Sequence, residues 1–159
     1  MRPDTTALRA TYRGQIGRLR SLGVAAAEIG RRATEDLAGH FAQQFLDPDR
    51  WCHFLAEIRK AEAVVDFDRW MRPDRLSRGR ARGCLGWLAA GREDARCVRL
   101  DRRGGMPALR IDLGTMDEGW VTSWPGVFVH FDAGRALAVT VHYEVFQCDL
   151  HACSGSPYR

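Results

Sequence analysis

The sequence predicts an α+β fold in which N-terminal helices pack on a C-terminal antiparallel β-sheet of about five strands, in two layers. Apolar residues recur at helical spacing before about residue 75 and alternate in short, glycine-bounded runs after it. The chain has 159 residues, which is enough for one hydrophobic core and short for two. We therefore expect one domain over residues 1–159, made of a helical portion (1–73), an arginine-rich connector (74–83), the sheet (84–147) and a tail (148–159).

Three amphipathic helices are predicted before residue 73. The first begins after a cap at Asp4 or Thr5, and the third begins at Pro48, because proline is tolerated at the first position of a helix. The third must end before Pro73. The apolar faces are, in order, Leu8, Tyr12, Ile16 and Leu19; then Ala26, Ile29, Ala33, Leu37, Phe41 and Phe45; then Trp51, Phe54, Leu55, Ile58, Ala61 and Val65.

Five candidate strands follow the connector, over residues 84–89, 95–100, 108–113, 127–132 and 136–146. The connections between them are short, and glycines stand where turns are needed. Short connections favour antiparallel neighbours, so the sheet is expected to be a meander.

The last hairpin of this sheet is predicted in most detail. A three-residue loop at 133–135 would place Asp132 opposite Ala136 and Val129 opposite Val139. The core face would then be Val127, Val129, Phe131, Leu137, Val139, Val141, Tyr143 and Val145. Alternation sends the remaining side chains to a second, open face that we expect to bind a partner: Phe128, His130, Asp132, Thr140, His142 and Glu144, continued by Arg99, Arg110 and Asp112.

Charge is unevenly distributed along a chain whose formal net charge is +4. Residues 69–103 carry eleven Arg and four acidic residues, whereas residues 104–159 carry three Arg and six acidic residues. Arg69 to Arg103 could neutralise phosphates, with Arg78, Arg80 and Arg82 as contacts, so nucleic-acid binding is an alternative function. A plain solvated face predicts the same residues.

Charged residues interrupt every apolar run of the sequence, so a membrane span is not expected. The first residues carry Arg at positions 9, 13, 18 and 20, which is unlike the apolar region of a signal peptide. A cytoplasmic protein is therefore expected.

Sequence motifs for catalysis are missing. The chain has no phosphate-binding glycine loop, no zinc-binding H-E-x-x-H, no nucleophile elbow and no dinucleotide-binding G-x-G-x-x-G. The prediction is a protein that is not an enzyme and needs no cofactor. A small cleft enzyme remains a second alternative, because His130 beside Asp132, or His142 beside Glu144, could form an acid–base pair.

The five cysteines are odd in number and form no C-x-x-C pair, which favours reduced thiols packed as small apolar residues. Cys148, His151 and Cys153, together with His142, offer thiol and imidazole groups of the kind that bind zinc. Their spacing matches no known metal-binding module, so no metal is expected.

The composition and the hairpin of residues 126–146 carry a resemblance to a known class of protein. The chain has 23 Arg, one Lys and no Asn, as expected of a GC-rich bacterium. In size and order of elements it resembles the small cytoplasmic immunity proteins that bacteria make against polymorphic or contact-dependent growth inhibition toxins. The resemblance implies a non-enzymatic protein that binds and neutralises a toxin domain. Many immunity proteins against nucleases are acidic, so a net charge of +4 implies a partner that is not basic, or binding through the acidic C-terminal portion.

Overall fold

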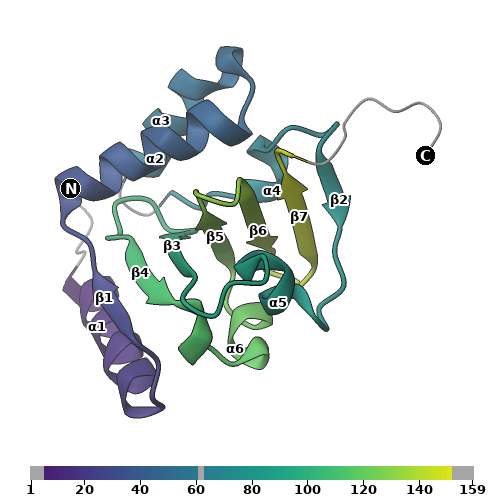
Figure 1. Ribbon diagram of the computed structural model, residues 1–159. Helices are drawn as coiled ribbons and strands as arrows, with labels where there is room; N and C mark the ends of the chain where they lie inside the picture. The colour runs from purple at the N-terminus through teal and green to yellow at the C-terminus, as the bar shows by residue number, and fades with distance from the viewer. Residues whose placement is uncertain (1–5, 61–62, 152–159) are drawn as a thin grey trace.

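The computed structural model describes residues 6–60 and 63–151 (Figure 1). In this part of the chain it contains a seven-stranded antiparallel sheet with helices on either side. The strands are β1 (Ala26–Glu28), β2 (Leu76–Arg78), β3 (Arg96–Asp101), β4 (Leu109–Asp112), β5 (Gly126–His130), β6 (Arg135–Val139) and β7 (Val145–Asp149). Their order across the sheet is β1-β4-β3-β5-β6-β7-β2. The predicted α+β class is confirmed, whereas the prediction of about five strands is wrong.

The first predicted helix begins where the sequence indicates, and the third begins at Pro48 as a 3-10 turn that continues into an α-helix at Trp51. The helices are α1 (Thr6–Ser21), α2 (Arg31–Phe45), α3 (Trp51–Arg59), α4 (Phe67–Trp70), α5 (Cys84–Ala89) and α6 (Glu118–Thr122), with 3-10 turns at Pro48–Arg50 and Leu113–Thr115. Two of the predicted boundaries are wrong. Residues 26–28 pair with β4 and so do not begin the second helix. The third helix ends at Arg59, before Val65 of its predicted apolar face, because the backbone of Lys60 is extended and Val64 pairs with Arg103.

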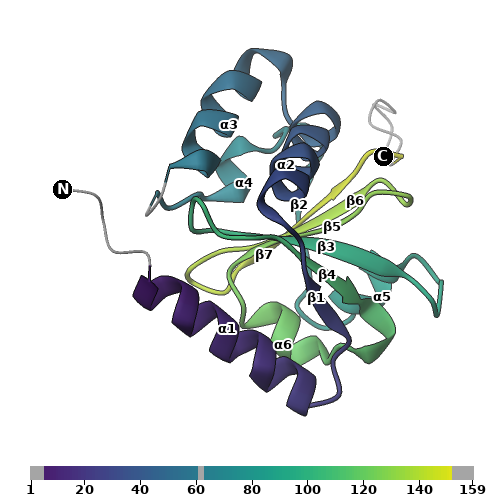
Figure 2. The same cartoon turned by 90° about the vertical axis from the view of Figure 1, so that its left-hand side faces the viewer.

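Helices cover both faces of the sheet, so the molecule has three layers rather than the expected two (Figure 2). On one side, α2, α3 and α4 form a core with the sheet residues Val98, Leu100, Val127, Val129, Ala136, Ala138 and Cys148. On the other side, α1, α5 and α6 cover Cys97, Leu109, Ile111, Phe128, Leu137, Val139 and Val145. No open sheet face is therefore left in the central strands.

Residues 84–89, expected to form a strand, are the helix α5. Its two buried residues, Cys84 and Leu88, are four positions apart, so they lie on one side of a helix and pack on the sheet. Gly83 precedes the helix with φ +87°, and Ala90 ends it with φ +55°. Both residues adopt the left-handed conformation, which at Ala90 is the conformation that commonly ends a helix.

The strand expected over residues 136–146 is two strands, β6 and β7, joined by a turn at 140–144. The register with β5 also differs from the prediction, because Val129 lies opposite Ala136 and not Val139. A shift by an odd number of residues exchanges the faces, so Leu137 shares a face with Phe128. Tyr143 and Val141, expected in the core, are exposed in the turn.

The connector of residues 74–83 is largely exposed, as expected, but it also supplies β2, which pairs with β7 at one edge of the sheet. Cys148 and Asp149, assigned to the tail, belong to β7. None of the helices within residues 6–60 and 63–151 has the length and apolar character needed to cross a membrane.

Candidate functional site

Three residues assigned to the open face lie in the interior instead. The exposed fraction is 0% for Phe128, 1% for Arg99 and 3% for His130. Their side chains point to the side of the sheet that α1, α5 and α6 cover, which is the physical reason for their burial. These three residues cannot form a partner-binding surface in this conformation.

The His130 imidazole supports the end of α5. Its Nδ1 lies 2.7 Å from the carbonyl oxygen of Leu88. A carbonyl can only accept, so Nδ1 carries the hydrogen that is donated. The guanidinium of Arg135 donates in the same way to the carbonyl of Trp87, one residue earlier in α5. Carbonyls at a helix C-terminus have no partner within the helix, and these two side chains supply partners for two of them.

Arg110, His130 and Asp132 are brought together, but not on an open sheet. Together with Arg96 they line a hollow of about 310 Å³ at the end of the sheet where β5 turns into β6. The carboxylate of Asp112 has a local role, because it accepts a hydrogen bond from the backbone N–H of Gly114 at 3.1 Å. The nine predicted residues therefore do not form one surface.

Thr140, His142 and Glu144 gather in the turn between β6 and β7, which we call the Tyr143 turn (residues 140–144). Thr140 closes it with three hydrogen bonds. Its N–H donates to the Glu144 carbonyl at 2.9 Å, its carbonyl accepts from the Tyr143 N–H at 2.9 Å, and its hydroxyl accepts from the Glu144 N–H at 3.1 Å. The turn is therefore a defined loop at the opposite end of β6 from Asp132.

The tip of the Tyr143 turn presents a large aromatic side chain to solvent. Tyr143 is 60% exposed and Val141 is 38% exposed. The backbone of Tyr143 has φ +61°, in the left-handed region that side chains other than those of Gly, Asn and Asp rarely adopt. His142 and Glu144, on either side, are also exposed.

A cavity of about 400 Å³ opens beside the Tyr143 turn. Its walls come from α1, from the end of β3 and the residues after it, from the loop between α6 and β5, and from the turn itself. Arg99, Arg102 and Arg103 line it together with Asp101, and we call it the arginine cavity. Tyr143 and Val141 form part of its wall, so the turn and the cavity are one continuous site.

Arg99 forms the floor of this site and is held by several groups. Its Nη1 donates to the Asp101 carboxylate at 3.0 Å, and its Nη2 donates to the Pro125 carbonyl at 2.6 Å. The guanidinium also lies over the ring of Trp124. A carboxylate, a carbonyl dipole and an aromatic face thus stabilise the positive charge. A buried charge is costly unless it has such partners.

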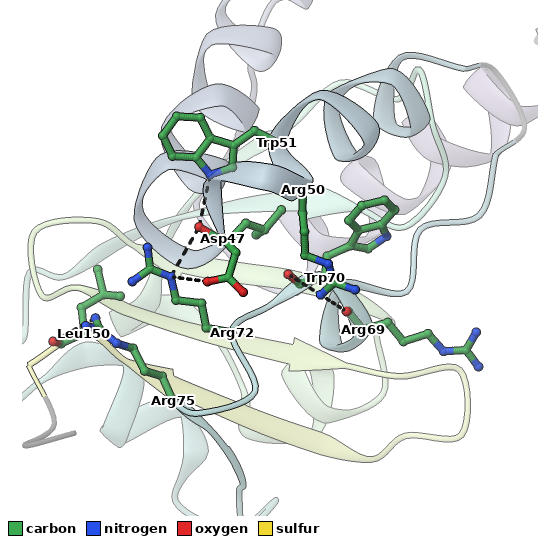
Figure 3. A network of polar contacts seen from close by, with 9 residues as sticks. Asp47, Arg50, Trp51, Arg69, Trp70, Arg72, Arg75 and Leu150 are labelled. Atoms are coloured by element: carbon green, nitrogen blue, oxygen red, sulfur yellow. Dashed lines mark hydrogen bonds and ion pairs between the residues drawn. The ribbon is translucent and has the colours of Figure 1, made fainter. Parts of the chain in front are cut away.

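Several arginines of the basic region are engaged inside the molecule (Figure 3). Arg72 contacts the Asp47 carboxylate at 3.6 Å, and Arg75 donates to the Leu150 carbonyl at 3.4 Å. Arg50 reaches the carbonyl of Arg69 at 2.8 Å and lies over the Trp70 ring, 5.6 Å from its centroid. Figure 3 shows Arg50 and Arg72 joining the segment around residues 46–50 to α4 and the residues after it, and Arg75 joining the segment before β2 to the end of β7. Arg72 and Arg75 are structural tethers, which reduces the basic surface that residues 69–103 offer.

Three of the four described thiols are packed in the interior as the sequence indicates, and the fourth is not. Cys84, Cys97 and Cys148 are buried, and Cys52 is exposed. Burial raises the pKa of Cys84 and of Cys148 to about 11, and it raises the pKa of Cys97 as well. Cys148 faces the α2–α4 core, whereas His142 lies at the other end of β7, and Cys153 lies outside the described residues. Within the described residues no group of three or more His, Cys, Asp or Glu side chains is placed to hold a metal ion.

Three residues of the site were missed by sequence reasoning. Tyr143 was placed in the core by extending one strand over eleven residues, although strands average about five or six residues, which could have indicated a turn. Arg102 and Arg103 follow directly after β3 and precede Gly104 and Gly105. A charged pair at a strand end is the signal that could have identified them.

Comparisons with known proteins find no matching family model, no matching curated protein and no matching solved structure. The Tyr143 turn and the arginine cavity are the features of this structure that point to a function.

Proposed function

We propose that this protein is a non-enzymatic, cytoplasmic protein-binding module of the immunity-protein kind, and that it binds and neutralises a bacterial toxin domain through the Tyr143 turn. The observation that carries the proposal is the Tyr143 side chain, 60% exposed at the tip of a turn with a left-handed backbone. Strained backbone of this kind is retained mainly where it serves a function. Tyrosine is among the residues that contribute most to protein–protein affinity.

Two further features of the turn support protein binding. The three hydrogen bonds of Thr140 hold the loop in one conformation, so less conformational entropy is lost when a partner binds. His142 and Glu144 flank Tyr143 with groups of different charge, and charge complementarity selects a partner. Arg102 and Arg103 lie beside the turn, so the complementary surface of the partner is acidic.

The test begins with capture of the partner by the tagged full chain in the bacterium that encodes it, with a nuclease wash. The C-terminal domain of the captured protein is then expressed in a host cell, alone and together with this chain. We expect the domain to arrest growth and the wild-type chain to restore it. Failure to capture one protein in stoichiometric amount, or growth arrest that the chain does not relieve, overturns the proposal.

Variants of the turn locate the contact surface. Tyr143→Asn, His142→Ala and Glu144→Arg should weaken binding of the captured domain and reduce growth rescue, because each changes a side chain at the turn. Leu22→Ser is the matched control, since Leu22 is also a large exposed apolar residue and lies at the far end of α1, outside the site. If all three turn variants bind as tightly as Leu22→Ser, the Tyr143 turn is not the contact.

A second candidate function, nucleic-acid binding, is favoured by the connector. Arg78, Arg80 and Arg82 are exposed, and among the described residues their side chains make no ion pair or hydrogen bond. Three phosphate contacts should make the affinity for a single-stranded oligonucleotide fall on the order of tenfold or more between 50 and 200 mM salt. A salt-independent affinity, or no binding at 50 mM salt, excludes this function.

A further inference from the structure

The arginine cavity carries more positive charge than its own carboxylate balances. Asp101 is the acidic residue in its wall, and it is already paired with Arg99 at 3.0 Å. Arg102 and Arg103 are half-buried, and within residues 6–60 and 63–151 their guanidinium groups have no ion-pair or hydrogen-bond partner. Arg102 and Arg103 therefore add two positive charges without a carboxylate partner to the wall of one partly open cavity.

Two guanidinium groups that share a cavity suit an anion with two negative charges. The planar fork of a guanidinium donates two parallel hydrogen bonds to a phosphate or carboxylate. A phosphate monoester carries about −1.5 to −2 charges at pH 7, which matches the two free cations of the wall. Partial burial removes water from these cations, so the interaction is stronger than it would be on an open surface.

The size and the rest of the wall indicate more than an inorganic ion. The volume of about 400 Å³ lies within the range of small-molecule sites, roughly 300–1,000 Å³. Met106, Trp124 and Val141 give apolar surface, and Gln15 and Ser123 give polar groups that can orient a ligand. An organic group attached to the phosphate would contact these side chains.

We propose that the arginine cavity binds a small phosphorylated organic molecule, with its phosphate held by Arg102 and Arg103. Arg99 is a positioning residue, because its guanidinium is occupied by Asp101 and the Pro125 carbonyl, and its pair with Asp101 cancels the carboxylate charge. Binding at this site needs no protein partner, so it is tested on the isolated chain and its outcome is separate from that of the protein-binding proposal.

Isothermal titration calorimetry of the full chain at low salt is the test. The probes are ribose 5-phosphate, ribose, inorganic phosphate and citrate. We expect ribose 5-phosphate to bind and ribose not to bind. Inorganic phosphate should bind at least tenfold more weakly than ribose 5-phosphate, because it lacks the organic group.

The variant Arg102→Gln/Arg103→Gln should weaken ribose 5-phosphate binding at least tenfold while circular dichroism reports an unchanged fold. The matched control is Arg31→Gln/Arg32→Gln, which removes the same charge from the exposed start of α2, outside the cavity, and should bind as the wild type does.

Four results would overturn the proposal. The first is no binding of ribose 5-phosphate to the wild type, and the second is equal weakening by the two double variants. Equal affinity for inorganic phosphate would assign the cavity to the free ion, and tighter binding of citrate would assign it to carboxylates.

Discussion

The guanidinium carbon of Arg99 lies 3.6 Å from the centroid of the Trp124 ring. A second aromatic ring, that of Phe128, lies 5.7 Å from the same carbon. Arg99 projects from the middle of a central strand, between the buried apolar residues Val98 and Leu100. The aromatic rings stabilise the charge through their electron-rich faces, and Asp101 balances it.

Removal of Asp101 tests this arrangement. Asp101→Ala should lower the free energy of unfolding by about 3–5 kcal/mol, because it leaves a buried guanidinium without its counter-charge. It also removes the acceptor for the Arg103 N–H. Urea denaturation measures the change. Asp66→Ala is the control, since the Asp66–Arg69 pair is exposed and should contribute less than about 1 kcal/mol. Equal losses in the two variants would contradict the role given to Asp101.

Gly126 should not tolerate a side chain. It has φ +151°, and a Cβ at this position would lie 2.9 Å from Arg99 Nη2 and 2.9 Å from the Leu100 carbonyl oxygen. Gly126→Ala should therefore lower the free energy of unfolding by about 1–3 kcal/mol. Gly86→Ala in α5, where a Cβ meets nothing within 4 Å, should instead raise it by about 0.5–1 kcal/mol. A neutral Gly126→Ala would show that Arg99 does not approach this backbone.

The left-handed backbone of Tyr143 should lower the stability of the fold, although the side chain contributes to partner binding. Tyr143→Asn should raise the free energy of unfolding by about 1 kcal/mol, because asparagine tolerates the left-handed backbone better than tyrosine. Ala90→Gly should give a gain of similar size, since Ala90 has φ +55° at the end of α5. Thermal unfolding measures both. Partner binding should fall only in Tyr143→Asn, and a destabilised Tyr143→Asn variant would contradict the strained conformation.

The cysteines should differ sharply in reactivity. Iodoacetamide at pH 8 should modify Cys52 in the folded protein, because this thiol is exposed. Cys84, Cys97 and Cys148 should react only after unfolding in urea, because burial hides them and raises their pKa values. Peptide mass mapping assigns each site. Rapid modification of Cys84 or Cys148 in the native state would mean that the core opens readily.

Stability should decline at alkaline pH. The pKa of the Cys84 and Cys148 thiols rises from 9.0 to about 11 on folding, so the unfolded state loses these protons more readily. The stabilising contribution is full below pH 9 and is lost as the pH rises toward 11. Urea denaturation between pH 8 and 11 measures this decline. The double variant Cys84→Ala/Cys148→Ala should show a smaller decline, and an equal decline would mean that other groups cause it.

The sequence predicted the α+β class. It also predicted strands at 95–100, 108–113 and 127–132, within two residues of β3, β4 and β5, because local spacing and glycine turns mark them. The prediction of a strand at residues 84–89 was wrong, because six mostly apolar residues are too few to distinguish a helix such as α5 from a strand by periodicity. The prediction of two layers was wrong because it gave the strand of Val127, Phe128 and Val129 only one buried face, although these three residues are consecutive and apolar. Such a run indicates a strand buried on both faces, and alternation alone does not reveal it.

The candidate site was harder to predict for a related reason. The Tyr143 turn is closed by the backbone and hydroxyl of Thr140, and it contains no Gly, Pro, Asn or Asp that would have marked a turn in the sequence. The arginine cavity is assembled from α1, β3, the loop after α6 and the turn, which are distant in sequence. Which of these segments meet in space depends on the tertiary structure, and the periodicity of the sequence does not describe it.

The two outermost strands of the sheet, β1 and β2, come from the first half of the chain, and the strands between them come from the second half. During synthesis on a ribosome, the phenylalanines Phe41, Phe45 and Phe54 emerge well before β5 and β6, which later cover them. The seven-stranded sheet is complete only after β7 has emerged and paired with β2. The growing chain therefore exposes an aromatic surface until the strands of its second half have emerged, and it should bind a chaperone during that interval.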